Sequence, residues 1–156
     1  MYGTPVRRGV VEVDDALLRL RRLWSASRSR LVDDGGTAVE MSSLLVVEAC
    51  ARGAQRGAEV AVVDVAELAD VAPSTASRLV DRAAAAGLLE RRPSAVDPRR
   101  TALVLTERGW GLRERAVRAR TGWLQDTLAA WSDEDVARLG ALLARFADEV
   151  GRPPLS

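Results

Sequence analysis

The sequence contains no lysine, isoleucine, asparagine or histidine, so all 23 of its basic residues are arginines. The absence of histidine removes the side chain most often used as a general base and as a metal ligand. A single cysteine excludes a disulfide framework, a Cys-x-x-Cys motif and a zinc ligand set. The four missing residue types share AT-rich codons, which suggests a GC-rich bacterial genome.

The residues that remain give no support for catalysis. Ser74 and Ser77 have no histidine to activate them as nucleophiles. The carboxylates are scattered without a metal-binding arrangement, and no glycine-rich phosphate loop is present. We therefore predict that the protein is not an enzyme and that it has no catalytic residues, no metal site and no cofactor.

Long apolar runs are also lacking. No stretch approaches the ~20 apolar residues that a membrane span needs, and MYGTPVRRGVVEVDD lacks the apolar segment of a signal peptide. The 156 residues, 47% hydrophobic and 29% charged, suit one globular domain, or one compact domain with added oligomerisation helices. We expect a cytoplasmic protein without a membrane partner.

Apolar periodicity and capping signals predict a mainly α-helical chain. Thr37–Glu40 and Asp64–Glu67 have the spacing of capping boxes that start helices. Between them, the β-branched run Val60–Val63 predicts a brief strand or an extended linker. The predicted helices span about residues 13–31, 37–53, 64–71, 73–86, 106–130 and 133–150.

A tight turn separates the third and fourth predicted helices. Pro73 suits the first turn of a helix, and Gly87 suits a left-handed stop. Strands at Leu88–Arg92 and Thr101–Leu105, joined by a polar loop, then form a β-hairpin. The expected fold is therefore mainly α with a small β-hairpin wing, namely a winged helix-turn-helix flanked by N- and C-terminal helices.

Charge is concentrated in this part of the chain. From Ala72 to Gly109, seven arginines stand against four acidic residues, which gives +3, whereas the rest of the chain carries −2. Such a local basic surface suits contact with a polyanion. Charge alone favours the plainer interpretation of a solvated helix face.

The segment VDVAELADVAPSTASRLVDRAAAAGLLERRPSAVDPRRTALVLTERG, residues 63–109, closely resembles the core of the MarR (multiple antibiotic resistance regulator) family. The order and spacing of its motifs carry the resemblance. The matching pieces are Leu68-Ala69, Ser74-Thr75, Ser77 to Arg82, Gly87 to Arg91, Asp97-Pro98-Arg99-Arg100 and Leu105 to Gly109. One departure is Ala72, where members of the family often have a hydroxyl residue as the helix N-cap.

The resemblance implies a homodimer that binds double-stranded DNA at a pseudo-palindromic operator and acts as a ligand-responsive repressor. Residues 1–156 would form a single MarR-like domain, with dimerisation helices in 11–36 and 107–151 and the DNA-binding region in 37–106. Apolar stripes on the first and last helices fit dimerisation, although packing within one chain is the alternative. The implied DNA-binding residues are Ser74, Thr75, Ser77, Arg78, Arg82, Asp97, Arg99 and Arg100.

Asp97 is implied to order the wing loop and Arg99 to point toward DNA. Arg91 and Arg92 are secondary phosphate candidates, for which a solvated position is equally compatible. The alternative function is a winged-helix ligand- or protein-interaction module without DNA binding.

Four further residues invite a functional interpretation. Trp24, Trp110 and Glu48 are weak candidates for a pocket that would bind a small-molecule effector, although a tryptophan more often fills a core and we expect Glu48 at the surface. Cys50 lies among alanines and valines, which favours a buried small hydrophobe over a redox switch.

Overall fold

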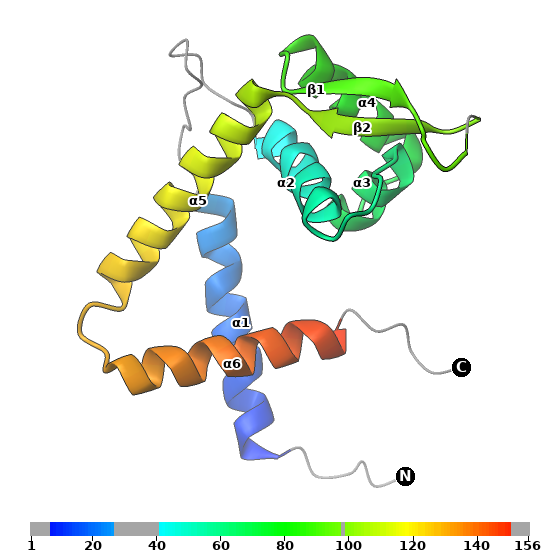
Figure 1. The fold of residues 1–156 in the computed structure, drawn as a ribbon. Coiled ribbons are helices and arrows are strands. Elements are labelled where there is room, and N and C mark those ends of the chain that lie inside the picture. Colours follow the sequence, from blue (N-terminus) through cyan, green and yellow to red (C-terminus); the bar gives the residue numbers. More distant parts are fainter. Residues whose placement is uncertain (1–6, 27–40, 98, 151–156) are drawn as a thin grey trace, which may run out of the picture. The chain divides into compact units, whose positions relative to one another are not determined.

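The computed structural model describes residues 7–26, 41–97 and 99–150, which form six helices and two strands (Figure 1). This arrangement confirms the predicted mainly helical fold with one β-hairpin. The elements are α1 (Arg8–Ala26), α2 (Met41–Gln55), α3 (Val62–Ala69), α4 (Pro73–Ala85), β1 (Leu89–Pro93), β2 (Thr101–Leu105), α5 (Glu107–Thr127) and α6 (Asp133–Val150). The chain divides into two compact units, residues 1–115 and 116–156, with the boundary inside α5.

The core of the first unit forms where α2, α3, α4 and the hairpin pack together (Figure 1). Aliphatic side chains from these elements, from Leu88 just before β1 and from Leu112 on α5 are removed from water, which is the main favourable term in folding. The side chains with no more than 2% exposure include Val46, Val47, Val65, Val80, Leu88, Leu89 and Leu112. This core fixes the helix-turn-helix and the hairpin against each other.

The start of α3 differs from the prediction. Val62 and Val63 are helical, so an extended conformation is wrong for these two residues, and the helix does not begin at Asp64. Asp64 instead lies in the first turn, where its Oδ2 accepts a hydrogen bond from the backbone N–H of Ala61 (2.6 Å). This cap stabilises a helix start that β-branched residues alone would disfavour. Ala61 keeps the expected extended conformation, and neither Val60 nor Ala61 is helical.

Helix α4 begins and ends as predicted. Pro73 occupies its first turn, and the preceding Ala72 is extended and provides no side-chain cap. Gly87 follows the helix with φ of +70°, a conformation that costs a residue with a Cβ atom more than glycine. The Leu88 N–H then donates to the Ala83 carbonyl oxygen (3.0 Å), which closes the helix end.

The hairpin is antiparallel, and its register pairs Leu89 with Leu105, Arg91 with Leu103 and Pro93 with Thr101. In β2 only Thr101 is exposed and Ala102, Leu103 and Leu105 are buried, whereas β1 is exposed after its first residue. The hairpin therefore packs on the core mainly through β2 and through the start of β1.

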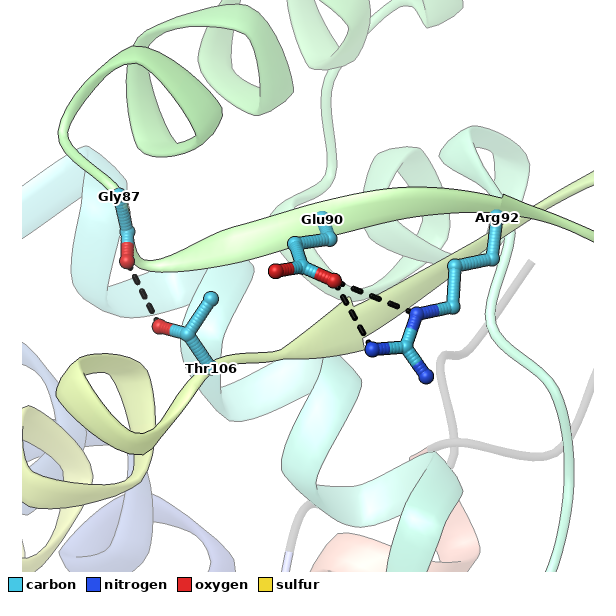
Figure 2. A network of polar contacts seen from close by, with 4 residues as sticks. All are labelled: Gly87, Glu90, Arg92 and Thr106. Carbon is cyan, nitrogen blue, oxygen red and sulfur yellow. Dashed lines mark hydrogen bonds and ion pairs between the residues drawn. The ribbon is translucent and has the colours of Figure 1, made fainter.

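Thr106 joins the base of the hairpin to α5. Its hydroxyl donates to the carbonyl oxygen of Gly87 (2.6 Å; Figure 2) and accepts from the N–H of Gly109 (3.1 Å). A Cβ atom on Gly109 would lie 2.1 Å from the Leu88 carbonyl oxygen. The Leu-Thr-x-x-Gly motif thus provides a helix cap and the close approach that the cap requires.

The terminal helices differ in part from their predicted bounds. Helix α1 begins at Arg8, five residues before the predicted start, while its predicted end and the Thr37–Glu40 capping box lie outside the described residues. Helix α6 is capped as expected, because the Ser132 hydroxyl accepts from the N–H of Asp135 (3.2 Å). No described helix is long and apolar enough to cross a membrane.

Candidate nucleic-acid interface

Helix α4 presents one polar face to solvent. Ser74, Thr75 and Arg78 are exposed, and Ser77 is half-buried. The opposite face is fixed in the core through alanine and valine side chains that show no exposure at all, namely Ala76, Val80 and Ala83. The sequence-predicted contact residues of this helix therefore share one rigidly held, accessible surface.

Two arginines differ within this surface. Arg78 is exposed, and no hydrogen bond or ion pair engages its side chain in the described part of the chain. Arg82, one turn later, is also exposed but interacts within the chain. Arg78 is thus the α4 cation that is available to an external anion.

The turn between the strands, residues 94–100, is built from backbone hydrogen bonds to two short polar side chains. The Ser94 hydroxyl accepts from the N–H groups of Val96 (3.1 Å) and Asp97 (3.0 Å). The Asp97 carboxylate in turn accepts from the N–H of Arg99 (3.0 Å). The expected ordering contact of Asp97 is therefore present, and it fixes the backbone that carries Arg99.

The side chains of Arg99 and Arg100 are exposed at this turn. The described residues provide no hydrogen bond or ion pair to the Arg99 side chain, whereas the charge of Arg100 acts on nearby Glu59. Arg99 and Arg78 thus each present an exposed guanidinium that has no partner within the described part of the chain.

Glu59, in the linker between α2 and α3, contacts this turn. Its role was not predicted from the sequence. Its carboxylate accepts hydrogen bonds from the Ser94 hydroxyl and from the N–H of Ala95 (2.7 Å). These two bonds, with the nearby charge of Arg100, lower the pKa of Glu59 below its usual range. No local pattern could reveal a contact between residues 35 positions apart.

The arginines of β1 are paired within the chain. Arg91 Nη2 lies 2.5 Å from Asp81 Oδ1, which links β1 to α4. Arg92 bonds Glu90 on the same strand through Nε (3.3 Å) and Nη2 (2.9 Å; Figure 2). Since all four side chains are exposed, these pairs are weak, but they partly neutralise the strand.

Comparison with known proteins supports the winged helix-turn-helix assignment. Residues 41–100 match the model of the MarR family. The resemblance to the MarR family is confirmed. No curated protein sequence matches this one. The match covers α2, α3, α4, β1 and the turn that follows it, where the DNA-binding residues predicted from the sequence lie.

Several solved structures share the fold over nearly the whole chain. A MarR family protein from Bacillus stearothermophilus has a TM-score of 0.76 at 18% identity, over 96% of this chain and 100% of that one. RV1404 from Mycobacterium tuberculosis has a TM-score of 0.69 at 22% identity, over 97% and 100%. BpsR from Bordetella bronchiseptica has a TM-score of 0.64 at 20% identity, over 93% and 99%. These likenesses extend the MarR-like fold to the terminal helices.

The effector-pocket candidates of the MarR-like chain occupy different environments. The expected surface position of Glu48 is wrong: its side chain is 17% exposed and lies between Arg52 Nε (3.2 Å) and Arg113 Nε (3.5 Å). It therefore links α2 to the first part of α5. Trp110 is half-buried on α5, and the side chain of Trp24 lies outside the described residues.

Cys50 is buried in α2 with 3% exposure, as the sequence favoured. Burial raises the pKa of its thiol to about 11, so that the reactive thiolate is scarce at neutral pH. Within residues 7–26, 41–97 and 99–150, no group of three or more histidine, cysteine or acidic side chains is placed to hold a metal ion.

Proposed function

We propose that this MarR-like protein is a homodimeric transcription regulator that binds a specific pseudo-palindromic DNA operator through α4 and the wing. The observation that carries the proposal is the pair Arg78 and Arg99. Both guanidinium groups are exposed and have no internal partner among the described residues. An exposed guanidinium without an internal partner on α4, and a second one on the wing turn, suit contacts with phosphates or base edges.

The dimensions of B-DNA assign a role to each part. The major groove admits one α-helix, which suits α4, and an arginine such as Arg78 can form a bidentate contact with guanine. Ser74, Thr75 and Ser77 lie on the same end and side of α4, where hydroxyl groups can reach phosphates or base edges. Arg99 would enter the adjacent minor groove, with Arg82 and Arg100 near the phosphate backbone.

Dimerisation is supported by apolar stripes that the single chain leaves exposed. On α6, Leu143 and Phe146 are 51% and 43% exposed, and no residue of this helix is buried. On α1, Val13 and Leu17 are 48% and 43% exposed. Stripes of this kind become stable when they bury against other helices, and a second copy provides them in the symmetry that a palindrome requires.

An effector that releases the protein from DNA completes the proposal. The support is the resemblance to BpsR, whose structure concerns regulation of its DNA binding by 6-hydroxynicotinic acid. In the present chain, the half-buried Glu48 and Trp110 offer polar and aromatic groups for such a ligand, with Trp24 as the third candidate. Repression is the corresponding regulatory outcome, since effector binding would remove a DNA-bound block.

The test is selection of bound duplexes from a random pool at near-physiological salt. The wild-type protein should enrich one pseudo-palindrome whose half-sites are roughly one helical turn, ~34 Å, apart. The Arg78→Ala/Arg99→Ala double variant should enrich nothing, whereas Arg138→Ala, which removes an exposed arginine of α6, should recover the same sequence. No enrichment by the ligand-free wild type would favour an interaction module without DNA binding.

A further inference from the structure

We propose that Glu59 is a positioning residue for DNA binding: its carboxylate holds the wing turn so that Arg99 is presented to DNA in one conformation. The inference rests on the proposed function, because it explains how the wing arginine reaches its place. Neither Glu59 nor Ser94 is proposed to contact DNA directly. Both act through the backbone of the turn.

The α2–α3 linker contacts the wing turn through Glu59. Glu59 receives the Ser94 hydroxyl on one carboxylate oxygen and the Ala95 N–H on the other. Ser94 is only 8% exposed, so its hydroxyl has little access to water as an alternative partner. Hydrogen bonds to an ionised carboxylate are roughly twice as strong as neutral ones, which makes this an effective anchor.

Further hydrogen bonds connect Ser94 to Arg99. The same Ser94 oxygen accepts from the N–H groups of Val96 and Asp97, and Asp97 then accepts from the N–H of Arg99. Donation to Glu59 orients the Ser94 hydroxyl so that its lone pairs face those two N–H groups. A continuous hydrogen-bonded path therefore joins Glu59 to the backbone of Arg99.

Glu59 is itself held in place by the backbone next to it. The carbonyl oxygen of its neighbour Val60 accepts from the N–H of Leu103 in β2 (2.8 Å), so the linker pairs with the hairpin through its backbone. Val60 is 5% exposed and is thereby held in the core. Glu59 consequently reaches the turn from a fixed support and does not merely follow its movements.

Electrostatics and positioning make opposite predictions for Glu59. A carboxylate near a DNA-binding turn repels phosphate, so its removal on charge alone should strengthen binding. If Glu59 positions the wing, its removal should weaken binding, because ordering the turn then has to occur at the moment of association. The sign of the change therefore separates the two interpretations.

The experiment measures affinity for the selected operator by fluorescence anisotropy. Glu59→Ala should weaken binding about tenfold, the effect of losing one or two charged hydrogen bonds. The matched control is Glu67→Ala, which removes the same charge from an exposed position of α3 and should leave affinity unchanged or slightly higher. Equal or tighter binding by Glu59→Ala would overturn the inference.

A double-mutant cycle shows whether the effect passes through Arg99. In an Arg99→Ala background, the loss caused by Glu59→Ala should largely disappear, because the side chain that it positions is gone. Hydrogen exchange should be faster at Ala95 and Val96 in Glu59→Ala, with core amides unchanged. Full additivity of the two substitutions would contradict a positioning role.

The two proposals can fail separately. A wild-type protein that selects no DNA refutes the proposed function, whereas an operator-binding protein unaffected by loss of Glu59 refutes only this inference. If Glu59→Ala does not fold, Glu59→Gln decides by the same comparison, since it keeps the shape and one acceptor oxygen but loses the charge. It should show a smaller loss of affinity in the same direction.

Discussion

The MarR-like winged-helix region and helix α6 use the same spacing of apolar residues but differ in burial. In the winged region, Val80 and Leu112 are completely buried within one chain. In α6, the equivalent stripe leaves Leu143 and Phe146 about half exposed, and no residue is buried. Periodicity thus identifies which face of a helix avoids water, while the partner of that face is a separate question.

Truncation of the winged-region core should have the largest effect. Leu112→Ala removes a fully buried side chain and should lower the free energy of unfolding by about 2–5 kcal/mol. Val96→Ala, at a position 86% exposed, is the control and should change it by less than ~0.5 kcal/mol. Urea denaturation measures both, and equal effects would show that the assigned core is wrong.

Charge placed in the α6 stripe should break the dimer and leave the winged region folded. Leu143→Glu with Phe146→Glu should raise the dimer dissociation constant at least about a hundredfold, because two carboxylates would have to be buried. Ala141→Glu, on the opposite side of α6, should leave it nearly unchanged. Sedimentation equilibrium distinguishes them, and a dimer that survives the double substitution would assign the stripe to packing within one chain.

Within the winged region, helix α4 begins without a side-chain cap. Ala72→Ser supplies the missing N-cap oxygen and should raise the free energy of unfolding by ~1 kcal/mol. Ala85→Ser, at the exposed end of the same helix, provides no cap and should give no gain. A thermal melt that shows equal stability for both variants would exclude the capping explanation.

The smallest effect concerns the one ionisable thiol in the buried region. Below pH 9, Cys50 is protonated in both the folded and the unfolded chain, so it does not make stability depend on pH. Between pH 9 and about 11 the unfolded thiol ionises and the folded one does not, so stability should fall as pH rises. Cys50→Ala should lack this component of the alkaline loss.

Thiol labelling checks the same assignment at neutral pH. A thiol reagent should modify native Cys50 far more slowly than the urea-unfolded protein, because both burial and the raised pKa suppress the thiolate. Rapid labelling of the native protein would instead restore the redox-switch interpretation.

Local sequence signals were sufficient for the fold and for α4. Pro73 and Gly87 mark helix ends through backbone geometry that depends only on neighbouring residues. The short β-prone run Thr101–Leu105 likewise predicted the second strand with its observed bounds. Where the sequence signal depends only on neighbouring residues, the predicted and observed elements agree.

The failures arose where tertiary or side-chain context outweighs propensity. Val62 and Val63 are helical because the Asp64 side chain caps the helix behind them. Glu48 is half-buried because Arg113, 65 positions away, is brought beside it, and Glu59 joins the wing through an equally remote contact. Such pairings depend on the folded topology, which periodicity does not specify.

We propose that Arg78 and Arg99 carry the DNA contact, and the salt dependence of operator binding is the first measurement that we would make. The logarithm of the association constant should fall linearly with the logarithm of salt concentration, by about 0.9 for each phosphate neutralised. Arg99→Ala should reduce this slope by about one, and Arg78→Ala should weaken binding and relax sequence preference. Arg138→Ala should leave both unchanged. An Arg99→Ala slope equal to that of the wild type would contradict the assigned role of the wing.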